Sequence, residues 1–258
     1  MRPVWTGAIG FGLVNIPVKM YSAAQESNLD LDMLDKKDLS NIHFQRINAK
    51  TGKEVTWENI VKGYKLKDRY IVLTDKDFEA ASAKKLKIIE ISNFLDETEI
   101  DTIYYDRPYY LEPEKNGSRA YALLRDALEK SGKVGIGTYV LRNKETLALL
   151  KPYQDLIVLN QLRFAEEIRN PDEMHLPGKT PSRSKELKMA LSLVEQLTGE
   201  FNYETYKDEY TSALMKMIKA KSKGVKIESP KLRVAHRTSE DLMVQLKASL
   251  EKRKKKIS

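Results

Sequence analysis

The spacing of apolar residues changes once along the chain, at Phe164, and this change constrains the fold more than any other feature. Before Phe164, short runs alternate apolar residues with polar or small ones, which is typical of strands. Three of these runs, 134–142, 145–151 and 155–164, have such short connections that they predict an antiparallel meander. After Phe164, apolar residues recur every three or four positions, as they do on helices. The sequence therefore predicts a β-rich core followed by a helical extension.

The opening segment, 4–22, favours two short strands around a tight bend. Its glycines, Gly7, Gly10 and Gly12, follow the order G-x-x-G-x-G, which differs from the dinucleotide-binding fingerprint G-x-G-x-x-G. They therefore indicate strand geometry and not a phosphate-binding loop. Further strands are expected at 69–73, 86–94, 102–105 and 108–112, and helices are expected after the candidate cap Thr74 and over 117–131.

A second ribbon, 42–57, is predicted as a hairpin with its turn at Thr51-Gly52. Its apolar alternation is poor on both faces, so we expect it to be exposed or to reach toward a partner. The wider segment 42–69 is basic. It carries Arg46, Lys50, Lys53, Lys62, Lys65, Lys67 and Arg69 against Glu54, Glu58 and Asp68. Such a surface is suited to an anionic partner.

Two helices are predicted after the strands. The first presents a stripe made of Leu187, Ala190, Leu191, Val194 and Leu197, and it ends at Gly199. The second presents Tyr206, Tyr210, Leu214, Met217 and Ile218 at spacings of four and three, and it ends before Gly224. A lone terminal helix rarely exposes that much apolar surface, so we expect the second helix to pack on the core or on a partner subunit.

Positive charge is concentrated at the C-terminal end. Residues 216–258 hold 14 Lys or Arg against 4 Asp or Glu, whereas the remainder holds 31 basic and 33 acidic residues. A short helix is predicted over 239–252, with Leu242, Leu246 and Leu250 on one face, before a run of Lys and Arg. A near-neutral body with a basic end indicates a polyanionic partner, most often nucleic acid. A solvated tail that only aids solubility has the same composition.

Several classes of protein are excluded by what the sequence lacks. It contains no Cys, which removes disulfides, thiolate nucleophiles and cysteine-ligated metals. No apolar run approaches the roughly 20 residues of a membrane-spanning helix, and the N-terminus has no signal-peptide pattern, so we expect a cytoplasmic protein. The histidines, His43, His175 and His236, lie far apart, and no phosphate-loop, serine-elbow or H-E-x-x-H motif is present. No catalytic residue, metal or cofactor is therefore assigned.

Five segments, in order, carry a family resemblance that covers most of residues 1–225. They are WTGAIGFGLVNIPVKMY at 5–21, IVKGYKLKDRYIVLTDKDFE at 60–79, IDTIYYDRPYYLEPEKNGSRAYALLRDAL at 100–128, GTYVLRNKETLALLKP at 137–152 and GEFNYETYKDEY at 199–210. Together they closely resemble bacterial Ku, the DNA-end-binding protein of non-homologous end joining. The departures fall after Gly224, in a short Lys-rich end of a kind that varies within the family.

The resemblance implies an α+β fold that is mainly β. It implies a Ku-type β-barrel core over 1–178 with a long arching insertion at about 30–70, a helical arm over 179–224, and a short helix with a basic tail over 225–258. It further implies a homodimeric ring that threads onto ends of double-stranded DNA, and that recruits and stimulates the multifunctional end-joining DNA ligase. It implies no catalytic activity, no cofactor, no membrane contact and a cytoplasmic, nucleoid-associated location.

Candidate binding residues follow from the basic segments and from the resemblance together. For DNA they are Arg46, Lys50, Lys53, Lys62, Lys65, Arg142, Lys144, Lys219, Lys223, Lys252, Arg253, Lys254 and Lys255. For the partner subunit or the ligase they are Tyr206, Tyr210, Leu214, Ile218, Leu242, Leu246 and Leu250. For Arg142 and Lys144, a plain surface turn is an equally good interpretation.

Two alternatives from other classes stay open. An RNA-binding or ribosome-associated accessory protein would also carry a basic tail, although the aromatic strand motifs of the common RNA-binding sheet are absent. A nuclease would need a cluster of metal-binding carboxylates, and no such cluster can be picked out of the sequence.

Overall fold

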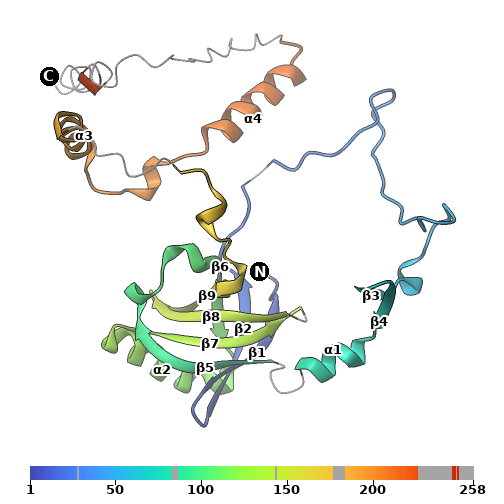
Figure 1. Cartoon of the computed structure of the whole chain (residues 1–258), viewed down its shortest axis with the longest axis horizontal. Helices are drawn as coiled ribbons and strands as arrows, with labels where there is room; N and C mark the ends of the chain where they lie inside the picture. Colours follow the sequence, from blue (N-terminus) through green and yellow to red (C-terminus); the bar gives the residue numbers. More distant parts are fainter. Residues whose placement is uncertain are drawn as a thin grey trace. The chain divides into compact units, whose positions relative to one another are not determined.

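The computed structural model describes residues 1–27, 29–82, 87–142, 144–176 and 184–225, together with 246, 247 and 249. The chain divides into two compact units, Met1–Pro171 and Asp172–Ser258. The first unit holds all the strands that the structure describes, and the second holds two long helices (Figure 1).

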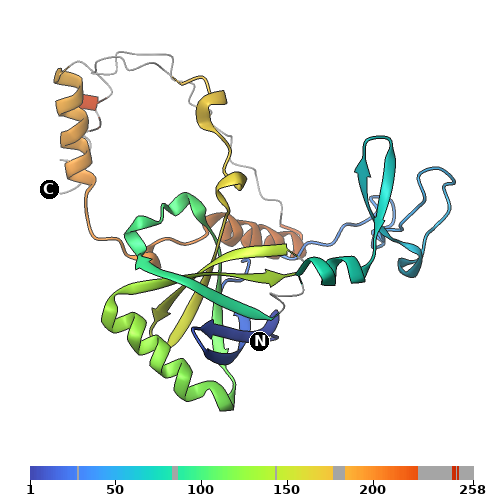
Figure 2. The same cartoon turned by 60° about the horizontal axis from the view of Figure 1, so that its bottom comes forward.

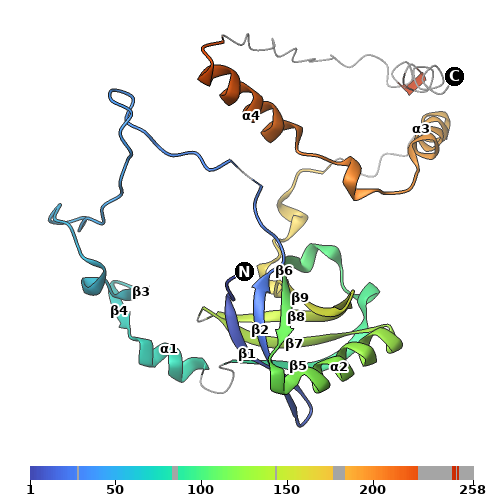
Figure 3. The same ribbon diagram turned by 180° about the vertical axis from the view of Figure 1, so that it is seen from behind.

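Seven strands of the first unit close into a barrel (Figures 1 and 3). They are β1 (Trp5–Phe11), β2 (Val14–Ser22), β6 (Tyr105–Pro113), β9 (Leu156–Leu162), β8 (Lys144–Tyr153), β7 (Lys133–Leu141) and β5 (Ile88–Asp96), in that order around the barrel. All the pairs are antiparallel except β1 with β5, which is parallel and closes the barrel. The predicted opening hairpin and the predicted meander, β7 to β9, are both confirmed. The mainly β class predicted for the fold is confirmed with them.

Two glycines permit the close approach of the strands that flank β5. A Cβ atom on Gly7 of β1 would lie 2.2 Å from the carbonyl oxygen of Lys87, and one on Gly137 of β7 would lie 2.2 Å from that of Glu90. Real side chains do not come this close to a backbone oxygen, so any other residue would push β1 or β7 away from β5. The interpretation of the opening glycines as strand geometry is confirmed at Gly7.

Helix α2 (Ser118–Ser131) packs on the barrel and completes its core (Figure 2). Tyr121, Leu124 and Leu128 are buried among the apolar residues of the strands, and Gly132 ends the helix with a φ of 65°. This is the helix predicted over 117–131. Truncating a leucine buried in this way typically lowers the free energy of unfolding by about 2–5 kcal/mol, so α2 is part of the core and not an appendage.

Residues 23–87 run between β2 and β5, and we call them the insertion. The insertion contains β3 (Lys62–Leu66), β4 (Arg69–Leu73) and α1 (Asp75–Ser82). Thr74 stands at the predicted N-cap position of α1, where the Asp77 carboxylate accepts hydrogen bonds from its backbone N–H and its hydroxyl, both at 2.7 Å. None of the residues described between Ser22 and Ile88 is buried. The insertion therefore has no core among these residues.

Two of the predicted strand segments differ from the structure. The prediction of a strand at 102–105 was wrong, since Thr102–Tyr104 forms a 3-10 turn and β6 begins only at Tyr105. The cause is local, because the Asp101 carboxylate accepts a hydrogen bond from the Ile103 N–H at 3.0 Å. The hairpin predicted over 42–57 has its turn, but its ladder is a single bridge between Ile47 and Glu54. Without an apolar face to pack, the ribbon does not extend into strands.

The second unit holds α3 (Ser184–Leu197) and α4 (Glu209–Ser222), joined through the 3-10 turn η7 (Tyr203–Thr205). Both predicted helices exist, and the second ends before Gly224, whose φ is 72°. The placement of Tyr206 on the second helix was wrong. Asp208 is the N-cap of α4 and accepts a hydrogen bond from the Thr211 N–H at 2.9 Å, so the helix begins at Glu209. Tyr206 belongs instead to the preceding 3-10 turn, as its C-cap.

Most of the C-terminal end lies outside the described residues. Leu246 is helical and half-buried, whereas Leu242, Leu250 and the run Lys252, Arg253, Lys254 and Lys255 are not described. The boundaries predicted for the arm, 179–224, and for the tail, 225–258, stay predictions.

Candidate nucleic-acid interface

A tight turn in the insertion presents three of the predicted DNA-binding residues. The side-chain oxygen of Asn48 accepts hydrogen bonds from the N–H groups of Lys50 and Thr51, at 2.9 and 3.1 Å. Gly52, with a φ of 67°, returns the chain, and its N–H donates to the Asn48 carbonyl at 2.8 Å. The turn therefore places Lys50 at its tip, with Arg46 and Lys53 on its two sides. We call residues 46–55 the basic turn.

The β3–β4 ribbon carries the next group of cations. Lys65 pairs with Tyr70 across the ribbon, and Lys62 pairs with Leu73, so that Lys62 and Lys65 lie on opposite faces because their positions differ by three. All five residues of β3 are exposed. The Lys62 ammonium also lies 4.8 Å from the centroid of the Phe78 ring in α1. The ribbon thus offers positive charge on both faces.

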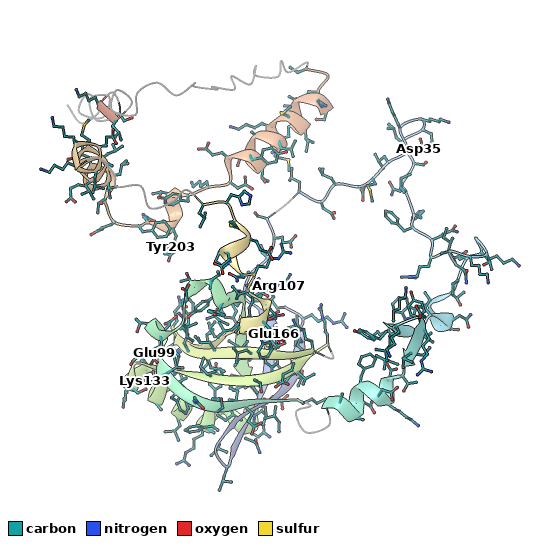
Figure 4. All side chains as sticks on the ribbon, in the orientation of Figure 1. Asp35, Glu99, Arg107, Lys133, Glu166 and Tyr203 are labelled. Atoms are coloured by element: carbon teal, nitrogen blue, oxygen red, sulfur yellow. The ribbon has the colours of Figure 1, made fainter. Side chains whose placement is uncertain are left out.

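Five cations on or beside the barrel differ from those of the insertion in having a carboxylate partner. The pairs are Arg125–Asp126 on α2, and Lys133–Asp96, Lys144–Glu167, Lys151–Glu97 and Arg163–Asp106 on the barrel, at 2.5 to 3.1 Å (Lys133 is labelled in Figure 4). In contrast, none of the seven Lys and Arg residues in 42–69 forms an ion pair with any residue that the structure describes. The insertion therefore holds cations that are available to an outside anion.

Lys144 is one of the residues predicted to bind DNA, but it already has a carboxylate partner. It lies at the start of β8, and its ammonium is 2.5 Å from Glu167, whose carboxylate also accepts from the Phe164 N–H. The hydrogen bond from Lys144 holds the pKa of Glu167 below its ordinary value. A phosphate would have to compete with Glu167 for Lys144. Arg142, at the same turn with a φ of 51°, is exposed.

The predicted residues of the second unit lie on α4 and beside it. Lys219 is exposed in the last turn of α4, and Lys223 is its C-cap. Tyr206, Tyr210 and Ile218 are exposed, whereas Leu214 is half-buried. The structure therefore places these residues in a different unit from the basic turn.

Two aromatic groups were missed by the sequence analysis. In the second unit, the Phe201 ring lies 4.5 Å from the ring of Tyr203 and 5.2 Å from that of Tyr206, between centroids, and all three side chains are exposed (Tyr203 is labelled in Figure 4). In the insertion, the Arg46 guanidinium lies 4.6 Å from the centroid of the Trp57 ring. The sequence did contain one sign of the second group, because Trp57 is a large aromatic residue in a segment that has no apolar face.

Neither a metal centre nor a membrane span is found in the described part of the chain. No group of three or more His, Cys, Asp or Glu side chains is placed to hold a metal ion among those residues. No helix within the same ranges is long and apolar enough to cross a membrane.

The fold and the interface together define a class: a closed β-barrel that carries a long, exposed and cation-rich insertion. A family model described as the Ku70/Ku80 beta-barrel domain matches residues 10–189, and the chain belongs to this family. The resemblance found in the sequence is thereby confirmed.

Three relatives show how far the similarity extends, and each is named non-homologous end joining protein Ku. The relative from Coxiella burnetii is 37% identical over 98% of this chain and 96% of its own length. The relative from Cupriavidus necator is 42% identical over 85% of this chain and 67% of its own length. The relative from Archaeoglobus fulgidus is 42% identical over 88% of this chain and 90% of its own length. The similarity therefore extends well beyond the barrel.

Proposed function

We propose that this chain binds the ends of double-stranded DNA in the repair of breaks by non-homologous end joining. The observation that carries the proposal is the set of cations between Arg46 and Arg69 that form no ion pair with the described residues. An unpaired cation in water can replace a condensed counterion on a DNA phosphate without giving up a protein carboxylate. The name shared by the relatives supports the same role.

The binding is proposed to be independent of DNA sequence. Phosphates repeat along every duplex, and contacts to them position a protein without reading the bases. The basic turn presents its cations on an exposed segment, and the ribbon presents them on both faces. This arrangement is suited to following a phosphate backbone.

We further propose that two copies form a ring around the duplex. The exposed apolar side chains of the second unit, which include Leu191, Val194 and Tyr210, are the kind of surface that proteins bury against a partner. Tyr206, Tyr210, Leu214 and Ile218 are assigned to that contact. A two-fold axis would also place one basic surface on each side of the DNA.

A competition experiment tests the ring. If the two insertions meet around the duplex, the protein can enter only at a free end. We expect linear duplex to compete far better than closed circular duplex of equal length, although both offer the same charge density. Protein loaded on linear DNA should stay bound at high salt once both ends are blocked. Equal competition by circles, with rapid release from blocked DNA, would show an open basic surface, and stronger competition by structured RNA would favour the RNA-binding alternative.

The proposal gives this chain no catalytic step, no metal and no cofactor, and it places the chain in the cytoplasm at the nucleoid. The joining chemistry belongs to the multifunctional end-joining DNA ligase, which we propose this chain recruits and stimulates through Leu242, Leu246 and Leu250. Leu246→Asp should abolish co-purification with that ligase and leave binding to duplex unchanged. Retained co-purification would move the ligase contact elsewhere.

A further inference from the structure

Trp57 is a large aromatic residue that the insertion does not use for packing. Its side chain is 70% exposed, and none of the residues described around it, between Ser22 and Ile88, is buried. It opens the 3-10 turn η1 (Trp57–Asn59), in which the Ile60 N–H donates to its carbonyl. The turn fixes the backbone at Trp57, and the ring stands in water.

One side of the ring is occupied by a cation. The Arg46 guanidinium carbon lies 4.6 Å from the ring centroid, within the range of a cation–π contact. The backbone supports this contact, because the Val55 N–H donates to the Arg46 carbonyl at 2.8 Å, and Val55 lies two residues before Trp57. With 70% of the side chain exposed, the ring still has an accessible aromatic surface.

The charges around the ring indicate what it binds. Arg46 belongs to the basic turn, whose Lys50 and Lys53 form no ion pair with the described residues. An apolar protein partner would have to strip water from these cations, whereas a nucleotide offers a flat base for the ring and a phosphate for the lysines. Bases inside a duplex are already stacked on each other, so a base with a free face is an unpaired one.

We propose that Trp57, supported by Arg46, stacks on an unpaired base of a single-stranded overhang at a DNA end. This inference rests on the proposed binding of DNA ends and adds a second substrate feature to it. The lysines of the basic turn hold the phosphates of the overhang, and Trp57 holds a base. Because every base has an aromatic face, the contact tolerates any overhang sequence.

The direct test compares two DNA ends in the full-length protein. Trp57→Ala should weaken binding to a duplex with a thymine overhang by about tenfold and leave blunt duplex unaffected, since stacking is lost only where a base is free. Trp57→Phe keeps an aromatic face and should restore most of the affinity. Tyr153→Ala, which removes an exposed aromatic ring from the barrel, is the matched control and should change neither affinity.

Fluorescence provides a readout that a purely structural role would not change. The chain has two tryptophans, and Trp5 is half-buried in the barrel, where its indole N–H donates to the Val140 carbonyl at 3.1 Å. Adding the overhang DNA should quench the emission of Trp57, and this change should vanish in Trp57→Phe. Blunt duplex should produce little quenching in either protein.

Arg46 can be tested as the positioning residue. Arg46→Lys keeps the charge but loses the flat guanidinium, so it should reduce the quenching and the preference for the overhang while leaving the salt dependence unchanged. Equal quenching in Arg46→Lys and in the unaltered protein would show that Arg46 does not position Trp57.

Three outcomes separate this inference from the proposed function. If the unaltered protein binds both ends and Trp57→Ala binds both equally well, stacking is overturned and the proposed function stands. If Trp57→Ala loses both ends and sediments as a smaller species, Trp57 contacts a second copy, and stacking is again overturned. If the unaltered protein binds the free thymine strand with quenching but does not bind duplex, stacking stands and the proposed function is overturned.

Discussion

At the scale of single residues, one buried hydroxyl joins a helix to two strands. Tyr121 of α2 donates to the Leu111 carbonyl of β6 at 2.5 Å, and its oxygen accepts from the Ile157 N–H of β9 at 2.6 Å. Leu111 and Ile157 are themselves partners in the ladder between these strands. Tyr121 therefore satisfies backbone groups at the point where the pairing of β6 with β9 ends, and burial raises the pKa of its hydroxyl.

We expect Tyr121→Phe to lower the free energy of unfolding by about 1–3 kcal/mol, because it leaves a buried donor and a buried acceptor without a partner. Urea denaturation measures the loss. Tyr153→Phe, at an exposed position, is the control and should change nothing measurable. An unaltered midpoint in Tyr121→Phe would mean that water replaces the hydroxyl.

The difference between paired and unpaired cations leads to a second prediction at this scale. Replacing both Lys50 and Lys53 with Ala should reduce the slope of log affinity against log salt by about two units, since each lost phosphate contact removes roughly 0.9. Lys133→Ala removes a cation that already has Asp96 as its partner, and it should leave the slope unchanged. Binding across a salt series measures both, and equal slopes in the two variants would move the DNA contacts away from the basic turn.

At the scale of elements, one face of α4 is less exposed than the other. Leu214 and Met217 are half-buried, whereas Ala213 is exposed. We expect Leu214→Asp to convert the proposed dimer to monomers or to misfolded protein in sedimentation, because a charge on that face cannot be buried without a partner. Ala213→Asp is the matched control and should stay dimeric. A dimeric, DNA-binding Leu214→Asp would rule out a buried role for this face.

The start of α4 carries a pH dependence. Hydrogen bonds from Thr211 lower the pKa of the Asp208 carboxyl below its ordinary value. The cap therefore stabilises the helix fully above the unfolded pKa of Asp, near about 3.9, and this stabilisation is lost as the pH falls through the lower, folded pKa. An NMR titration should find Asp208 titrating below an ordinary aspartate, and Asp208→Asn should make the helicity of α4 insensitive to acid over this range. An ordinary pKa for the Asp208 carboxyl would contradict its role as the N-cap of α4.

The elements that could be predicted from sequence are those with a local cause. The alternation in β7 to β9 and the helix end at Gly132 are local, and both are confirmed. The start of α4 was missed because Asp208 competes with the apolar spacing through one hydrogen bond. The parallel pairing of β1 with β5 and the partner of Lys144, which lies 23 residues away, were missed because no local pattern encodes them.

At the scale of the whole molecule, the basic end beyond the described residues is expected to act through charge alone. Deleting 252–258 removes five Lys and Arg residues. We expect the deletion to lower DNA affinity for all sequences alike and to reduce the salt slope by up to about four units. Co-purification with the ligase should be unaffected, because the leucines precede the deletion. Loss of DNA and ligase binding together would reject this division of roles.

The insertion leaves the barrel after β2, at Ser22, and returns at β5, at Ile88. Both of these strands pair with β1, for example Met20 with Trp5 and Ile88 with Ala8. For the barrel it is a closed loop, and the entropy of closing a loop grows only with the logarithm of its length. Doubling the length costs about 0.6 kcal/mol, less than the loss of one buried leucine, about 2–5 kcal/mol. Insertions and deletions in this loop are therefore nearly neutral for stability, so its reach can evolve to match the width of the partner that we propose it surrounds, while the barrel stays the same.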